Sequence, residues 1–501
     1  MFTSNTPSIR VRSATEHDQR KDGQYVLYWM TAYRRLESNF ALERAVELAV
    51  AWNKPLVVFE GLRLGYRWAS DRFHRFVLDG MIDNLKAAQR LTVTYVGYVE
   101  PTSGDGSGLA ETLAKYACAT VTDDFPCFFH PALYGAIVKR WPCAVELVDS
   151  NGILPMRNTE RTFTVAHSYR RYMQKEIHRE TPVFPRADPL RHVELPRLKK
   201  LPEEVSNRWK FVTGKELEQF DLSKLDIDHS VRPTDARGGR AEGLRLLNSF
   251  AGAKLEEYDQ ARNEPDRYGS SGLSAHLHFG HVSAHEVFEA IASSQYGWSF
   301  EKISKPNGKM NGFWNMGQSA EAFMDQLMTW REIGFNMCSR EANYDRYESL
   351  PEWARKTLSE HAGDARPFVY TPEEFESART HDALWNAAQR QLVVEGRIHN
   401  YLRMLWGKKI LHWSQSPQEA LKIMIHLNNK YALDGRDPNS YSGIFWVLGR
   451  YDRAWGPERE VFGKIRYMTS ESTRSKFSVK GYLQRYAQVG DGKEGHKVIK
   501  S

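Results

Sequence analysis

Short apolar runs and amphipathic stretches alternate along the first 150 residues. The runs recur about every 30 residues and are rich in β-branched and aromatic side chains. Strands separated by helical stretches of this length form βαβ units, which build a parallel sheet. We therefore expect an α/β, Rossmann-like N-terminal domain over residues 1–182. Its strand candidates are YVLYWM (25–30), PLVVFEG (55–61), LTVTYVGYV (91–99), CATVTDDF (118–125) and AVELVDSNGIL (144–154).

Beyond residue 228 the apolar positions recur with a helical period. Examples are GLRLLNSF, SAHEVFEAI, AFMDQLMTWREIGF and LVVEGRIHNYLRMLWGKKILHW. The pattern predicts an all-helical domain over residues 228–501. Residues 183–227 hold several prolines and little periodicity, so we expect a linker that lies over the surface. A chain of 501 residues also exceeds what one hydrophobic core usually serves.

Composition excludes several classes of protein. The chain is 41% hydrophobic and 26% charged, it has no apolar run of bilayer length, and its first 23 residues lack the apolar core of a secretory signal. We expect a cytoplasmic protein without membrane contact, associated with the nucleoid if bacterial. The four cysteines form no C-x-x-C pair, so neither disulfides nor a metal site is expected. No G-x-G-x-x-G or G-x-x-x-x-G-K-[ST] follows a strand, which argues against a dehydrogenase or an ATPase.

Charge and aromatic content add two weaker indications. The net charge of +7 fits a protein that binds nucleic acid, although a solvated basic surface explains it equally well. Nine of the 14 tryptophans lie beyond residue 290, within the expected helical domain. This uneven distribution suggests that the helical domain has a special use for indole rings.

Three segments of the helical domain carry candidate chemistry. Residues 270–280 place serines and a glycine before a helix, where free N–H groups favour an anion, although an ordinary N-cap fits as well. Trp406 and Trp413 share a helix face, and Trp385 precedes a helix break at Gly396, so three indoles form either an electron relay or plain core. Residues 427–439 are dense in polar groups that a polar ligand or solvent would satisfy. His276, His278, His281 and His285 do not converge with a carboxylate, so no metal is predicted.

Several short sequence strings, in a fixed order along the chain, indicate a common function for these segments. The strings are THDALWNAAQ, EGRIHNYLRMLWGKKILHW, LNNKYALDGRDPN, DRAW and REVFGKIRYM, with weaker matches in ARNEP, LSAHLHFG and VDSNGILP. Together they resemble the class II cyclobutane pyrimidine dimer DNA photolyases, of the photolyase and cryptochrome family. The resemblance covers nearly the whole chain. It implies an α/β antenna-type domain, a helical domain that binds FAD, and ultraviolet-damaged DNA as the substrate, with no obligate protein partner.

The resemblance also assigns roles to individual residues. It implies that FAD is bound by Tyr258, Ser271, Gly272, Leu273, Ser274, Arg403, Asn428, Asp434 and Asp437. It implies an electron relay that runs from the flavin to the surface through Trp406, Trp385 and Trp413, and a dimer pocket formed by Gln326, Trp330, Met404 and Trp446. The phosphates of DNA would be held by a basic strip comprising Arg450, Arg453, Arg466, Arg474, Lys476 and Lys480. A second, antenna chromophore is possible, and its identity is not readable.

The chain departs from the family at the dimer pocket, where Gln326 replaces a glutamate. A glutamine amide donates a hydrogen bond at any pH, so it can replace a protonated carboxyl. Glutamine near this position also resembles the (6-4) photolyases, and His399 lies on a neighbouring helix, which makes (6-4) photoproduct repair the alternative substrate. A third possibility is a blue-light signalling flavoprotein of the cryptochrome type. Trp330, Trp446 and the basic strip favour repair over signalling.

Overall fold

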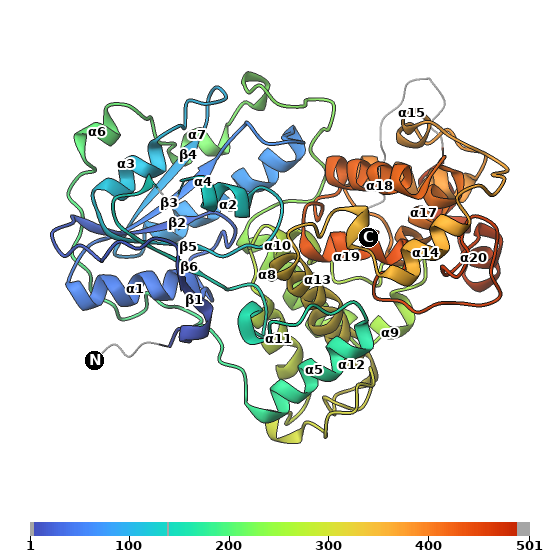
Figure 1. Cartoon of the computed structure of the whole chain (residues 1–501). Helices are drawn as coiled ribbons and strands as arrows, with labels where there is room; N and C mark the ends of the chain where they lie inside the picture. The colour runs from blue at the N-terminus through green and yellow to red at the C-terminus, as the bar shows by residue number, and fades with distance from the viewer. Residues whose placement is uncertain (1–4, 138–139, 488–501) are drawn as a thin grey trace.

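The computed structural model describes residues 5–137 and 140–487 (Figure 1). A six-stranded sheet in the order β1-β6-β5-β2-β3-β4 forms the α/β part of the chain. All neighbouring strands are parallel except β1 and β6. This confirms the predicted fold class, an α/β N-terminal part followed by a largely helical remainder. The strands are β1 (Val11–Ser13), β2 (Tyr25–Met30), β3 (Leu56–Leu62), β4 (Val93–Val99), β5 (Ala117–Asp123) and β6 (Ala144–Val148).

Both faces of the sheet are covered, which explains why its strands are continuous apolar runs. Every residue of β2 and β5 is buried. On one face α1 (Phe40–Trp52) packs on β2 and β5, and Asn39 caps its N-terminus by accepting from Ala41 N and Leu42 N. On the other face lie α3 (Leu109–Lys115) and the segment around Trp209. The remaining helices of this part are α2 (Asp71–Ala88) and α4 (His130–Ile137).

The expected linker folds back over the α/β part. It forms α6 (Glu203–Ser206) and α7 (Gly214–Glu218), whose Val205 and Leu217 join the apolar clusters of the sheet and of α2. The segment is therefore packed against the sheet and α2 rather than free in solvent.

Helices make up most of the rest of the chain, and several pack against one another around the predicted site. In Figure 1, α5 lies beside α12, apart from the sheet that precedes it in sequence. The helices are α5 (Ala166–Arg179), α8 (Arg240–Ser249), α9 (Tyr258–Ala261), α10 (Ser274–His278), α11 (Ala284–Ser293), α12 (Gln318–Met324), α13 (Arg331–Arg340), α14 (Glu352–Glu360), α15 (Pro372–Glu376), α16 (Ala383–Glu395), α17 (Asn400–Trp413), α18 (Pro417–Tyr431), α19 (Pro438–Val447), α20 (Ser470–Lys476) and α21 (Lys480–Arg485). A π-helical segment, η7 (Asp325–Trp330), joins α12 to α13. None of these described helices combines the length and the apolar character needed to span a bilayer.

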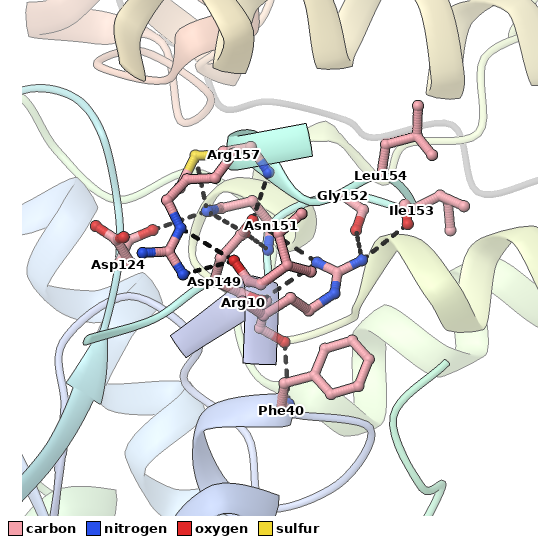
Figure 2. A network of polar contacts seen from close by, with 12 residues as sticks. Arg10, Phe40, Asp124, Asp149, Asn151, Gly152, Ile153, Leu154 and Arg157 are labelled. Atoms are coloured by element: carbon pink, nitrogen blue, oxygen red, sulfur yellow. Dashed lines mark hydrogen bonds and ion pairs between the residues drawn. The ribbon is translucent and has the colours of Figure 1, made fainter. Parts of the chain in front are cut away.

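The loop after β6 fastens the sheet to the helical part (Figure 2). The buried guanidinium of Arg10 donates to the backbone carbonyls of Asp149, Gly152 and Ile153 at 3.2, 3.0 and 2.8 Å. On the other side of the loop, Ile153 N donates to the Glu332 carboxylate of α13 at 2.7 Å. Because both partners are buried, the loop fixes where α13 begins relative to the sheet.

Candidate functional site

The run from α12 through η7 to α13 opens to solvent at two positions. Of the described residues 319–338, only Gln326 and Trp330 are partly exposed, and all the others are buried. The side-chain amide of Gln326 has no hydrogen-bond partner among the residues that the structure describes. These two side chains are therefore free to contact a ligand, whereas their neighbours form core.

Two further helices open in the same manner, namely α19, which packs on α13, and α17, which packs on α19. In the first turn of α17, Arg403 and Met404 are partly exposed, while residues 405–411 are buried. Along α19, Gly443 and Trp446 reach solvent, and a Cβ added to Gly443 would meet no atom within 4 Å. Since α19 packs against both α13 and α17, the expected pocket residues occupy open positions on helices in mutual contact.

The expected FAD residues converge where α10 meets the loop after α18. Arg403 donates from Nη2 to Asp434 Oδ1 at 3.0 Å. Burial alone would raise the pKa of the Asp434 carboxyl, but the charge of Arg403 and hydrogen bonds from Arg403 and Ser274 outweigh burial and hold that pKa below its usual range. The pair therefore carries one positive and one negative charge at neutral pH, at the entrance to α17.

The remaining polar groups come from α18, α19, α10 and the loop after α18. Asn428 Nδ2 donates to Ser440 Oγ at 2.6 Å, and His278 Nδ1 lies 3.2 Å from Asp437 Oδ2. Gly272, just before α10, has a φ of +74°, and a Cβ added there would meet its nearest atoms, of Leu246, only at 3.8 Å, so the backbone there is open to a ligand. Tyr258 lies apart from the loop, buried against Phe323 of α12.

One partly buried cation tests whether these residues fit FAD. The Nε of Arg262 makes no hydrogen bond to any described residue and lies 4.0 Å from Asp259 Oδ1 in an ion pair, and its guanidinium lies 5.7 Å from the Tyr258 ring centroid. A diphosphate needs cations and hydroxyl or backbone donors, which Arg262 and the Ser271–Ser274 segment supply. The residues present therefore fit an anionic dinucleotide. Arg262 belongs to the ARNEP string, whose resemblance to the family could have identified it.

The three relay tryptophans form a buried chain. The Trp385 indole donates to the backbone carbonyl of Trp406 at 3.0 Å, and the rings of Trp385 and Trp413 are 6.1 Å apart at 69°. Trp406 donates from Nε1 to Gln389 Oε1 at 2.9 Å. The expected surface end of the relay is not at the surface, because Trp413 is only 1% exposed and is covered by Tyr370 and His381.

The basic strip is not uniform. Arg453, Arg474, Lys476 and Lys480 are exposed. Arg450, by contrast, is 1% exposed, donates to the Tyr344 carbonyl at 3.1 Å and stacks on Phe445, so the expectation that it binds phosphate is corrected: it is a core residue. Arg466 is ion-paired to Asp452 at 2.8 Å.

A large cavity, which the sequence did not reveal, lies at the carboxyl ends of the parallel strands. Its volume is about 540 Å³, and it is lined by residues that directly follow β2 to β5, among them Thr31, Arg63, Glu100 and Phe125. Ligands of open α/β sheets bind at this edge. Arg436, from the loop after α18, also lines the cavity.

The histidines around α10 and α11 are mostly core residues. His276, His281 and His285 are buried, and burial lowers the pKa of each imidazole below its usual value. In the described part of the chain, no three His, Cys, Asp or Glu side chains are grouped as metal ligands. The four cysteines are free thiols, all buried.

Comparisons with known proteins find relatives along nearly the whole chain. The chain is 32% identical over 494 residues to the deoxyribodipyrimidine photo-lyase of Methanothermobacter thermautotrophicus, covering 96% of this chain and 99% of that one. The enzymes of the same name from Potorous tridactylus and Arabidopsis thaliana are each 32% identical, over 95% and 91% of this chain and 84% and 88% of theirs. The crystal structure of a bacterial class III photolyase from Agrobacterium tumefaciens superposes with a TM-score of 0.63 at 17% identity, covering 93% of this chain and 86% of that one, which shows a shared fold. No protein-family model matches the chain.

Proposed function

The chain belongs to the deoxyribodipyrimidine photolyase family, and from that premise we propose that it splits cyclobutane pyrimidine dimers in ultraviolet-damaged DNA by the class II reaction. Family membership makes it a light-driven DNA-repair lyase and a flavoprotein. The finer assignment, class II with a cyclobutane substrate, is our proposal. The observation that carries it is the set of open positions at Gln326, Trp330, Met404 and Trp446, on helices that are otherwise buried.

Trp330 and Trp446 would clasp a dimer that has left the duplex. Each indole offers a flat apolar face, and stacking is worth about 1–3 kcal/mol per base, which offsets the few kcal/mol needed to extrude the lesion. Gln326 would donate its free amide to a pyrimidine carbonyl, and Met404 would form the floor. An amide has no charge that would oppose an electron arriving on the dimer, so the change from glutamate keeps the contact.

FAD would be held by the Ser271–Ser274 segment and Arg262 at its diphosphate, and by Arg403, Asp434 and Asn428 at its ring system. Bound there, FAD would supply the light-driven one-electron chemistry that ring opening requires. The Arg403 guanidinium stays charged at every working pH and would stabilise negative charge beside it. Its ion pair with Asp434 keeps this cation in place at 3.0 Å.

The three tryptophans would pass electrons to the cofactor. The N–H groups of Trp406 and Trp385 donate to the oxygens of a glutamine amide and a backbone carbonyl. Neither acceptor is a base at neutral pH. An oxidised indole at these two positions would therefore keep its proton, and the positive charge would move on to Trp413.

The environment of His399 argues against (6-4) photoproduct repair. That alternative needs a histidine able to give a proton to the lesion. Burial, with the charges of Arg397 and Arg485, lowers the pKa of His399 to about 4, so the ring is neutral at working pH. No feature of the described residues favours a signalling role without repair.

The cavity at the strand ends is our candidate for the antenna site. Several aromatic side chains line it, including Trp29, Tyr66, Phe128 and Phe129. One buried donor that lines it, Arg436 Nη2, has no hydrogen-bond partner among the described residues. A planar aromatic chromophore with a carbonyl or anionic oxygen would stack on these rings and accept from this donor.

Repair of two defined oligonucleotides tests the proposal. The prereduced protein is illuminated with a duplex that carries one cyclobutane dimer or one (6-4) photoproduct, and restored bases are measured. We expect repair of the first substrate and none of the second. Repair of only the (6-4) photoproduct would refute the class II assignment, and repair of neither by a protein that retains photoreducible FAD would favour signalling.

A further inference from the structure

Lys408 is a fully buried lysine next to the proposed dimer pocket. It lies on α17, is 0% exposed, and donates from Nζ to the backbone carbonyl of Val447 at 2.6 Å. The same Nζ lies 4.7 Å from the ring centroid of Trp446. Lys408 therefore contacts both the indole of Trp446, which forms one wall of the proposed pocket, and the backbone of Val447.

A buried ammonium without an anionic partner is costly. None of the ion pairs between described residues involves Lys408, and the nearest charges that act on it are those of Asp452 and Arg466. Its one hydrogen bond to a neutral carbonyl leaves two N–H groups unpartnered. The face of the Trp446 indole is the direct contact that favours a cation at this position, and the charge of Asp452 adds to it.

Lys408 also lies on the same face of α17 as the pocket floor. Met404 and Lys408 are four residues apart, one helical turn, so their side chains are neighbours. α17 and α19 pack against each other, and the contact from Lys408 to Val447 and Trp446 spans the two helices. The floor and the wall of the pocket are thus joined through a single side chain.

We propose that Lys408 is a positioning residue for Trp446, and that it holds the indole in place for the lesion while it carries its proton. This inference rests on the proposed function, because Trp446 has a lesion to receive only in that case. Lys408 does not touch the lesion. It acts by fixing the orientation of the Trp446 indole.

The protonation of Lys408 changes within the working range. Burial lowers the pKa of its ammonium from 10.5 to about 7; the Asp452 carboxylate opposes this shift and the Arg466 guanidinium adds to it. Below that pH the cation holds the indole, and above it a neutral amine keeps only the bond to Val447. Arg466, 5.6 Å from the Trp446 centroid, stays charged throughout and cannot produce this change.

The measurable quantity is the preference for damaged DNA. Binding in the dark is compared for a duplex with one cyclobutane dimer and for the same duplex undamaged, at pH 6 and pH 8.5. Contacts to phosphates contribute equally to both duplexes, so their ratio of affinities isolates the pocket. A cation over an indole contributes to equilibria by about three- to tenfold, and we expect the wild-type ratio to fall by that factor between the two pH values.

Variants distinguish positioning from general destabilisation. Lys408→Met should have the low ratio at both pH values, whereas Lys422→Met, at an exposed lysine of α18, should behave as the wild type. In a Trp446→Leu background, Lys408→Met should change nothing further, because the side chain that it positions is absent. FAD content and melting temperature report whether each variant is folded.

The outcomes separate the two claims. A wild-type ratio that is well above one but equal at both pH values overturns the inference, and this comparison needs no variant. An equal loss on Lys408→Met with and without Trp446 also overturns it, because Lys408 would then act elsewhere. A ratio near one at both pH values overturns the proposed function itself, and the inference with it.

Discussion

Two cations of the basic strip should respond differently to substitution, because only one of them is already neutralised. Lys476 is exposed, and no carboxylate of a described residue forms an ion pair with it. Arg466 donates from Nε and Nη2 to Asp452 at 2.8 and 3.1 Å, and its guanidinium stacks 3.9 Å from the Trp455 centroid. We predict that Lys476→Gln removes one phosphate contact, whereas Arg466→Gln removes none.

The magnitude follows from counterion release. Each phosphate neutralised on duplex DNA contributes about −0.9 to the slope of log affinity against log salt. A fourfold rise in salt, from roughly 50 to 200 mM, therefore costs about 3.5-fold in affinity per contact. Lys476→Gln should flatten the slope by about 0.9, while Arg466→Gln should leave it nearly unchanged. Because Arg466 also lies 5.6 Å from the Trp446 ring, its loss should instead lower the preference for damaged DNA.

The assay is fluorescence anisotropy on a labelled undamaged duplex across this range of salt. Asp452→Asn combined with Arg466→Gln is the matched control, since it removes the carboxylate that Arg466→Gln would leave unpaired. A slope that flattens equally in Arg466→Gln and Lys476→Gln would refute the reasoning, because it would mean that the ion pair opens on DNA. If the wild-type affinity did not depend on salt, the basic strip would not contact the phosphates of DNA.

Three further changes have definite outcomes. Trp406→Phe should retain FAD but lose its reduction by blue light and a thiol, followed by flavin absorbance; undiminished photoreduction would exclude the relay. Gln326→Glu should keep or raise dimer repair, whereas Gln326→Leu should cost about 1–3 kcal/mol of stabilisation, measured as repair rate, because a pyrimidine carbonyl loses its donor; equal rates in both would contradict that contact. Burial lowers the pKa of Lys408 from its ordinary value of 10.5 to about 7 in the folded chain. Between these two pH values the unfolded chain binds more protons than the folded chain, so the free energy of unfolding of the wild type increases as pH rises. Lys408→Met should abolish that gain, measured by urea unfolding at pH 6 and 9, and an unchanged pH dependence would show that the lysine is not buried in solution.

The architecture was predictable where the pattern was long and strict. Five apolar runs at regular spacing indicated β2 to β6, because strands covered on both faces have no polar alternation to obscure them. Gly396 was expected to separate two helices, and it does so with a φ of +69° at the C-terminus of α16. The antiparallel edge strand β1 was missed, since three residues, Val11–Ser13, are too few to show a period.

The candidate site is predicted from resemblance more than from residue chemistry. The open positions of Gln326, Trp330 and Trp446 depend on which neighbours are absent, and a linear pattern does not contain that information. Arg450 shows the opposite error. It lies in a basic segment and was therefore expected to bind phosphate. In the fold, the Tyr344 carbonyl and the Phe445 ring enclose it. Burial of a cation depends on tertiary partners, which spacing alone does not supply.

Helix α17 shows how a local pattern can hide a buried cation. Lys408, Lys409 and His412 fall within about 100° of one another on this helix, so the sequence pattern alone indicates a solvated polar face. In the fold, residues 405–411 are all buried. Neighbouring helical residues point about 100° apart, so the two cations must find different partners. Lys408 lies over Trp446 of the pocket wall, and Lys409 lies 5.1 Å from the Trp413 centroid at the end of the relay. Buried charged residues are costly unless each has a specific partner, and here both partners are tryptophans of the proposed site. The two lysines therefore become informative only once their burial is known, because a solvated helix face would hold them without any specific partner.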